Sequence, residues 1–306
     1  MVVSAASRAR PSSSSPPHTP ALLVIPCAGR RLRYRGRPLV MGILNVTPDS
    51  FSDGGRYLEP DAAVERGCRM AEEGADVIDV GGVSTRPGAE GISAEEEARR
   101  VVPVVKRLAR LVPVPLSVDT ASAQVAAQAL DAGASLINDI TALRGDPTMA
   151  STIAKHRAGV VLMHMQGTPR TMQERPRYRD VVQEVAEFLI RAAEQAQEAG
   201  IDRARLLIDP GLGFGKTVRH NLQLLQALPR FVALGWPVVI GPSRKSFIGK
   251  TLGLDLPERL AGTLACVAYA QRSGAHMVRV HDVKETTQWL RMWDAIERAD
   301  ETRREH

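Results

Sequence analysis

The sequence predicts an α/β fold, a parallel (β/α)₈ TIM barrel, on the basis of three features. From residue 38 onward, a short apolar run alternates with a longer amphipathic stretch, and this unit recurs eight times. Each run is apolar enough to be buried on both faces, as parallel strands are. Glycines stand where the amphipathic stretches end. An open doubly wound sheet is the alternative. The eight runs are 39–45, 76–82, 114–120, 135–140, 160–164, 205–211, 237–241 and 276–282.

The segments between the runs have helical spacing. An i, i+3, i+4, i+7 apolar pattern starts at Val185, a similar one starts at Leu260, and a third joins Trp289, Trp293 and Ile296. These patterns predict helices between the strands.

Local signals predict where several helices begin and end. Ser93 and Glu96 have capping-box spacing, and Asp146 with Pro147 has that of an N-cap and first helical residue. Left-handed C-caps are expected at Gly74, Gly133, Gly159, Gly200 and Gly274.

The ends of the chain differ from the barrel, which we place at residues 38–297. Residues 1–21 are rich in Ser, Pro and Arg and contain no acidic residue, so we expect a disordered tail. The same composition fits an organellar transit peptide, although no amphipathic helix is evident. Residues 22–37 are expected to form a β-hairpin that closes the bottom of the barrel, and 298–306 a charged C-terminal tail.

Charge and cysteine content restrict the partners of the protein. The 306 residues include 40 Lys and Arg against 34 Asp and Glu, but seven arginines precede the first acidic residue, Asp49. Subtracting these seven from 40 leaves 33 basic residues, so the barrel itself is neutral and we expect no nucleic-acid partner. No apolar run approaches 18 residues, so we predict no membrane span. Three scattered cysteines predict reduced thiols and a cytoplasmic location.

Polar residues gather at the ends of the predicted strands, where a barrel of this type holds its catalytic groups. Turn starters and N-caps explain one or two of them. Asn138, Arg279 and His281 are different because they lie inside or at the edge of apolar runs, where polar groups need a partner or a ligand. The strand-end residues are Asn45, Asp79, Asp119, Asn138, Asp139, His164, Asp209, Ser243, Arg244, Lys245, Arg279, His281 and Asp282.

These residue types suit a flat, nitrogen-rich ring joined to an anion. Hydrogen bonds to ring N–H and NH₂ groups can come from Asp119, Asn138 and Asp209. A phosphate or pyrophosphate suits Lys245, Arg279, His281 and Arg86. His164 is compatible either with a ligand or with a core histidine. The polar loops at 45–55 and 81–89 are predicted to be lids over this site, ordinary connections being the alternative.

The stretch IDPGLGFGKT (208–217) ends like a phosphate-binding loop, but that pattern requires Gly at position 210, which is Pro. Proline has no N–H to offer a phosphate. We therefore predict no nucleotide site, assign the stretch to the ring-binding site through Asp209, and expect no role for Lys216. The glycines at 211, 213 and 215 are expected to form a tight turn.

Eight motifs in order resemble those of the dihydropteroate synthase family, over residues 38–297. They are MGILNVTPDSFSDGG (41–55), GGVSTRPGA (81–89), LSVDT (116–120), INDI (137–140), LMHMQGTP (162–169), IDPGLGFGKT (208–217), SRKSFIG (243–249) and RVHDV (279–283).

The resemblance implies a reaction and a set of roles. The family joins 4-aminobenzoate to 6-hydroxymethyl-7,8-dihydropterin pyrophosphate with Mg²⁺ present, and its members resemble one another in forming homodimers. The implied pterin-binding residues are Asp119, Asn138, Asp209 and Lys245, with Met163 and Gly241 lining the pocket. Arg279 and His281 resemble the pyrophosphate anchors, and Asn45 the metal-contacting residue. Thr85, Arg86, Pro87 and Ser243 match positions that hold aminobenzoate or order its loop, and Phe214 is placed near aminobenzoate.

One position departs from the family pattern: the usual GGES reads GGVS, with Val83 in place of Glu. A non-catalytic pterin-binding paralogue is therefore one alternative. A pterin-dependent methyltransferase is another, although it has no use for the SRK and R-x-H cations.

Overall fold

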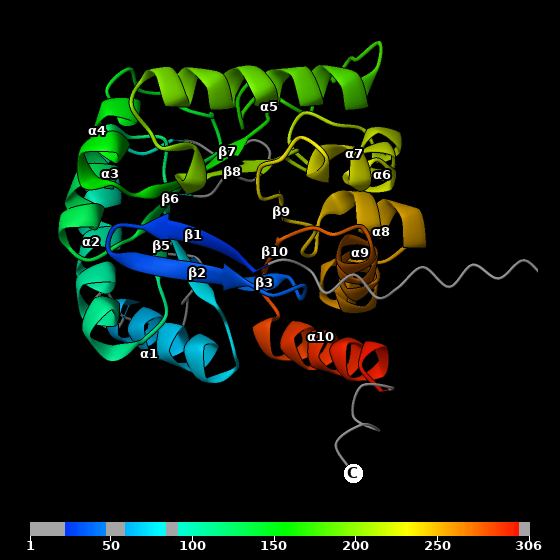
Figure 1. The fold of residues 1–306 in the computed structure, drawn as a ribbon, viewed down its shortest axis with the longest axis horizontal. Helices are drawn as coiled ribbons and strands as arrows, with labels where there is room; N and C mark the ends of the chain where they lie inside the picture. The colour runs from blue at the N-terminus through cyan, green and yellow to red at the C-terminus, as the bar shows by residue number, and fades with distance from the viewer. Residues whose placement is uncertain (1–21, 47–58, 84–90, 300–306) are drawn as a thin grey trace, which may run out of the picture.

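The computed structural model describes residues 22–46, 59–83 and 91–299, and these form a closed barrel of parallel strands (Figure 1). The strands run in the order β8-β7-β6-β5-β4-β3-β10-β9, and a bridge between Ile208 and Val238 joins the last to the first. The (β/α)₈ prediction is confirmed and the open sheet is excluded. The strands are β3 (Leu39–Asn45), β4 (Val77–Gly81), β5 (Leu116–Asp119), β6 (Leu136–Asp139), β7 (Gly159–Met163), β8 (Leu206–Asp209), β9 (Val239–Ile240) and β10 (Met277–Val280).

Helices surround the barrel, and one or two of them follow each strand (Figure 1). Short 3₁₀ turns, η2 (Arg203–Arg205) and η3 (Leu256–Glu258), lie in the connections. The helices are α1 (Glu59–Glu72), α2 (Ala94–Leu111), α3 (Ala123–Asp131), α4 (Met149–His156), α5 (Val181–Glu198), α6 (Val218–Gln226), α7 (Leu228–Val232), α8 (Ser246–Leu252), α9 (Leu260–Arg272) and α10 (Val283–Glu297).

Alternate residues of each strand serve two separate cores, because successive side chains point to opposite faces. Val40 and Leu44 of β3 belong to the large core between strands and helices, whereas Met41 belongs to the core inside the barrel. Within the described segments, no helix has the length and apolar character of a membrane span.

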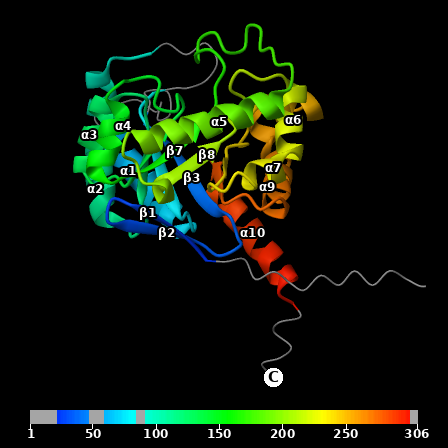
Figure 2. The same cartoon turned by 45° about the horizontal axis from the view of Figure 1, so that its top comes forward.

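The hairpin prediction is confirmed. Strands β1 (Leu23–Cys27) and β2 (Arg30–Tyr34) pair antiparallel and lie across one end of the barrel (Figure 2). Ile25 and Leu32 pack against inward-facing residues of the strands, including Leu207 and Met277. The hairpin therefore covers the bottom of the barrel and leaves the carboxyl ends of the strands for a site.

Two of the predicted boundaries are wrong. Helix α4 has Thr148 as its N-cap, because the Asp146 carboxylate accepts the N–H of Thr148 at 2.9 Å and closes the preceding turn. Gly159 is not a C-cap; the left-handed residue after α4 is Arg157 (φ 50°), and Gly159 opens β7. A Cβ at Gly159 would lie only 3.2 Å from that of Cys27, so the glycine lets the hairpin approach the barrel.

The N-cap of α2 is confirmed, since the Ser93 hydroxyl accepts the N–H of Glu96 at 3.2 Å. In α10, the helix is confirmed, but the stripe that predicted it lies partly in solvent. Val283 and Leu290 form its buried face, whereas Ile296 is 61% exposed.

Candidate functional site

A buried ion network crosses the interior of the barrel at the carboxyl ends of the strands. Arg279 of β10 donates from Nε to Asp79 of β4 at 2.6 Å and from Nη2 to Asp119 of β5 at 2.7 Å. The amide of Asn138, on β6, donates to the same Asp79 oxygen at 3.2 Å. Four strands thus bring together two carboxylates, one guanidinium and one amide.

The strand register explains why these side chains meet. Asp79 and Asp119 occupy inward positions of the neighbouring strands β4 and β5, with Gly81 paired to Asp119 and Asp119 paired to Asn138. Arg279 occupies an inward position of β10, which is separated from β4 by β3. Asp139, one residue further on, points outward and instead accepts hydrogen bonds from the backbone N–H groups of Thr141 and Leu143, both at 2.7 Å. A shift of one residue along the strand therefore separates Asn138, which points into the site, from Asp139, which forms the turn.

Burial controls the protonation of this network. Desolvation raises the pKa of Asp119 to about 7, although the Arg279 guanidinium opposes the shift; the nearby Asp79 carboxylate adds to it. Burial disfavours the charged form of Arg279, but the adjacent Asp79 and Asp119 outweigh it and hold its pKa above the ordinary value. The second Asp79 oxygen, Oδ1, has no hydrogen-bond partner among the described residues.

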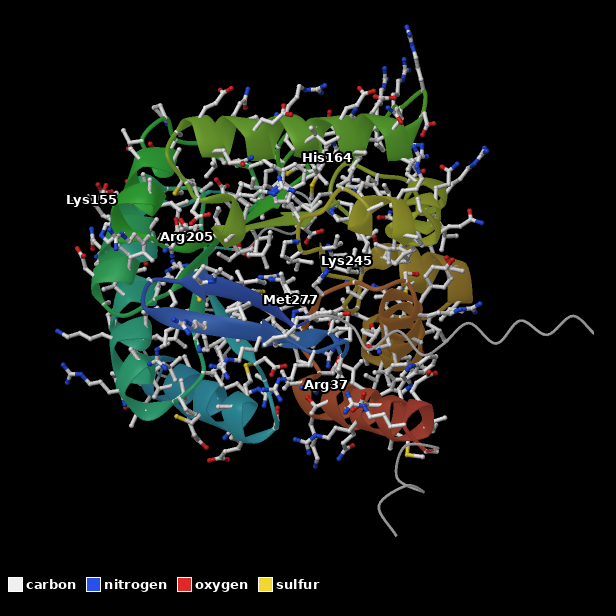
Figure 3. The ribbon with its side chains drawn as sticks, in the orientation of Figure 1. Arg37, Lys155, His164, Arg205, Lys245 and Met277 are labelled. Carbon is white, nitrogen blue, oxygen red and sulfur yellow. The ribbon has the colours of Figure 1, made fainter. Side chains whose placement is uncertain are left out.

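A second charged group lies on the opposite side of the barrel mouth. Asp209, at the end of β8, accepts the N–H of Gly211 at 2.7 Å, and burial raises its pKa while Lys245 opposes the shift. Burial lowers the pKa of Lys245 to about 8. A Cβ at Gly241 would lie 3.9 Å from the Lys245 Nζ atom and 3.8 Å from the Arg279 Cβ atom, so Gly241 lies in contact distance of both side chains. Figure 3 shows Lys245 inside the ring of helices.

Phe214 and Met163 form the apolar part of the mouth. Both are buried in a small cluster with Ile140, Met165 and Met172. The Lys245 Nζ atom lies 4.4 Å from the centre of the Phe214 ring, at cation–π distance. The site therefore offers an apolar wall beside its carboxylates.

Ser243, His281 and Asn45 lie on the third side of the mouth. The Ser243 hydroxyl lies 2.9 Å from His281 Nδ1 and accepts the backbone N–H of His281 at 3.1 Å. His281 and Asn45 line a pocket of about 460 Å³ to which Arg66, Arg244 and Lys284 contribute. Four Lys and Arg side chains line this pocket against three acidic ones, and Arg66 and Arg244 are paired with Glu73 and Asp282. The remaining excess of basic side chains suits an anion.

All predicted site residues that the structure describes therefore come to one end of the barrel. Thr85, Arg86 and Pro87 lie outside the described residues, as do most of the two predicted lids. His164 is a buried histidine packed on Phe188 of α5, with ring centres 4.9 Å apart, which agrees with the core alternative.

Sequence reasoning missed the importance of Asp79, which was only noted as a strand-end residue. Its signal was present, because a carboxylate within the fully buried strand VIDVG needs a partner. Arg66 was missed entirely; it lies on α1, and its contact with the carbonyl of His281 at 3.5 Å depends on packing between distant segments.

Comparisons with known proteins agree with this geometry. The family model described as pterin binding enzyme matches residues 41–281. Dihydropteroate synthase of Escherichia coli K12 is 48% identical over 267 residues, covering 87% of this chain and 94% of that protein. The structure of Xanthomonas albilineans dihydropteroate synthase with 4-aminobenzoic acid is 50% identical with a TM-score of 0.86, covering 90% of this chain and 99% of the other. The same enzyme in complex with 7,8-dihydropteroate gives 48% identity and a TM-score of 0.81, with 90% and 98% covered.

The barrel and its charged mouth thus define a pterin-binding enzyme. Within that class, the identity and coverage are high over nearly the full length of the relatives. The chain belongs to the dihydropteroate synthase family, whose members are transferases of folate biosynthesis.

Proposed function

We propose that the barrel mouth joins the amine of 4-aminobenzoate to the CH₂ group of 6-hydroxymethyl-7,8-dihydropterin pyrophosphate and releases pyrophosphate. The observation that carries this proposal is the buried network of Asp79, Asp119, Asn138 and Arg279 beside a basic pocket. A ring with donor groups and an attached anion matches those two halves.

The pterin ring is assigned to the inner half of the site. Asp119, Asn138 and Asp209 exchange hydrogen bonds with the ring nitrogens. Lys245, whose charge lies near Asp209, also contacts the ring. Met163 and Gly241 line the pocket. Phe214 borders the aminobenzoate. Thr85, Arg86 and Pro87 remain predicted aminobenzoate contacts.

The pyrophosphate is assigned to the pocket beside Asn45, His281 and Ser243. Arg279 lies two residues before His281 in the chain. Its Nε and Nη2 atoms bind the carboxylates, and we assign its Nη1 atom to the anion.

Mg²⁺ fits this pocket through Asn45. Among the described residues no three His, Cys, Asp or Glu side chains form a metal cluster. An amide oxygen is nonetheless suitable, because Mg²⁺ is commonly bound by one or two protein oxygens together with substrate phosphates. When bound, the ion neutralises charge on the departing pyrophosphate.

The chemistry requires no protein nucleophile. The amine lone pair forms the new C–N bond, the C–O bond to pyrophosphate breaks with its electron pair, and the amine proton is lost to solvent. Positive charge on the CH₂ carbon spreads into the pterin ring, where anionic Asp119 and Asp209 favour it. Arg279, His281 and Lys245 stabilise the leaving anion.

A homodimer is the proposed assembly. Large apolar side chains are exposed on neighbouring outer elements: Leu222 on α6, Leu252 on α8, Leu256 on η3, Tyr269 on α9, and Met292 and Ile296 on α10. Leu222 and Tyr269 line an open, largely apolar groove of about 750 Å³ between α6 and α9. A second copy of the chain would cover this face.

The cytoplasmic location of the protein stays a prediction.

Incubating the purified chain with the pterin pyrophosphate, 4-aminobenzoate and Mg²⁺ tests the reaction. The synthase forms dihydropteroate and pyrophosphate in equal amounts. A non-catalytic paralogue binds the pterin and forms neither, and a methyltransferase forms neither under these conditions. Either of the last two outcomes contradicts the proposal.

A further inference from the structure

Lys216, which lies in the loop between β8 and α6 just before the N-cap Thr217, is buried with 3% of its surface exposed. The failed phosphate-loop pattern left it without a predicted role. Burial of an amino group costs free energy unless its N–H groups are satisfied. Its contacts therefore show what it does.

The Lys216 Nζ atom lies at hydrogen-bond distance from three groups. They are Nδ1 of His164 at 3.0 Å, the carbonyl oxygen of Phe214 at 2.9 Å and the carbonyl oxygen of His164 at 3.3 Å. No salt bridge links Lys216 to a carboxylate in the described part of the chain. The amino group thus joins the loop after β7 to the loop after β8.

The charge states are compatible with all three contacts. Burial, with Lys216 and Arg144 nearby, lowers the pKa of His164 to about 2, so its ring is neutral. Burial also lowers the pKa of Lys216 well below its ordinary value. An ammonium can donate to all three groups, and a neutral amine can donate to both carbonyls and accept from Nδ1–H.

The two loops touch closely at this point. Gly211 (φ 70°) and Gly215 (φ 64°) have left-handed backbones. A Cβ at Gly211 would collide with the carbonyl oxygen of His164, and one at Gly215 would lie 2.6 Å from that of Gln166. The predicted tight turn is confirmed, and it brings the backbone of one loop onto the other.

Phe214 connects this contact to the substrate site. Its carbonyl binds Lys216, while its ring lies under the Lys245 ammonium, which also donates to the carbonyl of Leu212. His164 lies beneath α5 and Lys245 lies inside the barrel (Figure 3). Lys216 and Lys245 therefore both bind the same short segment, Lys216 at Phe214 and Lys245 at Leu212 and the Phe214 ring.

We propose that Lys216 is a positioning residue for the reaction: by binding the carbonyls of Phe214 and His164, it fixes the segment that places Phe214 and Lys245 against the substrates. This inference rests on the proposed function. Since the amino group acts through Phe214, its loss should matter less once the Phe214 ring is absent.

A double-mutant cycle between Lys216→Met and Phe214→Ala tests this, with kcat/KM as the readout. Each single variant is expected to lose between about tenfold and a hundredfold, as small misplacements of site groups do. The double variant should lose little more activity than the more impaired of the two single variants, because the effects of coupled residues are not additive. Multiplicative losses, or Lys216→Met within twofold of wild type, overturn the proposal.

Matched variants keep the test interpretable. Lys155→Met, on the exposed surface of α4, should keep wild-type activity. If Lys216→Met does not fold, Lys216→Gln, whose side chain is shorter and carries no ammonium, replaces it in the cycle, and the same coupling with Phe214→Ala is expected or the proposal fails. If the wild type has no turnover, the proposed function is wrong, and the cycle is measured on the dissociation constant for the pterin pyrophosphate instead.

Discussion

At the scale of single residues, the site depends on charges that are buried together. Asp79 is fully buried and shares Arg279 with Asp119. Removing one partner of a buried pair leaves an uncompensated charge and costs about 3–5 kcal/mol. The network therefore serves the fold as well as the ligand, which is why its members cannot be exchanged singly without consequence.

The raised pKa of Asp119 predicts an acid limb in the activity profile. Its carboxylate is lost as the pH falls through about 7, so kcat/KM should decrease below that pH. The negative charge of Asp79 is one of the influences that raise the pKa of Asp119, and Asp79→Asn removes it. Burial, Glu97 and Asp139 still raise this pKa in the variant, and Arg279 still lowers it. The midpoint of the acid limb should therefore move to lower pH. Profiles with the same midpoint in both proteins contradict this assignment.

Sequence reasoning located most of the site because strand ends and motif order are local properties. Asp119, Asn138, Asp209 and Arg279 all lie at predicted strand ends, and the structure brings them together. The partners of each group were not predictable, because Arg279 and Asp79 are 200 residues apart and meet only through closure of the barrel. The contacts of Lys216 were not predictable for the same reason, because its partners His164 and Phe214 belong to two different loops.

At the scale of elements, the two ends of the barrel have different tasks. The hairpin of β1 and β2 fills the bottom with apolar side chains, and the loops at the other end carry the charged residues. Barrel enzymes commonly divide stability and catalysis in this way.

Substitution in the hairpin should therefore lower stability without changing substrate affinity. Ile25 is 1% exposed, so Ile25→Ala should cost about 2–5 kcal/mol in the free energy of unfolding, measured with urea. KM for both substrates should stay unchanged. Val24→Ala, on the exposed face of the same strand, is the control and should cost well under half as much. A changed KM in Ile25→Ala, or equal losses in the two variants, would show that the hairpin has another task.

Element boundaries were predicted less well than element types. The strands and helices follow from periodicity, which many residues share. The start of α4 and the role of Gly159 depend on single contacts, namely the turn closed by Asp146 and the approach of the hairpin. The approach of the hairpin is a tertiary contact, which a local pattern does not contain. The Asp146 turn is local, but the same Asp-Pro pair is compatible with an N-cap and with a turn that precedes the helix.

At the scale of the whole molecule, the outer helices differ from one side of the barrel to the other. The exposed apolar residues belong to α6, α8, α9 and α10, and these helices lie on one side of the barrel in Figure 1. The site faces the end of the barrel rather than this side. Assembly and substrate binding should therefore be separable.

A charge on the apolar face tests the dimer. Tyr269→Glu places a carboxylate in the groove between α6 and α9, where a partner would desolvate it. We expect the mass in solution, measured by light scattering, to change from dimer to monomer. Tyr269→Phe should remain dimeric. A monomeric wild type, or a dimeric Tyr269→Glu variant with unchanged affinity, would contradict the proposed interface.

The turnover of Asp119→Asn tests the central claim most directly, because Asn keeps the shape of the side chain and removes its charge. Asp131→Asn, at the exposed end of α3, is the matched control. Loss of one charged contact in the transition state typically costs on the order of 3 kcal/mol, or about two orders of magnitude in rate. The account predicts that loss in Asp119→Asn, with the fold intact by circular dichroism and with wild-type activity in Asp131→Asn. Dihydropteroate formation by Asp119→Asn within twofold of wild type would contradict it.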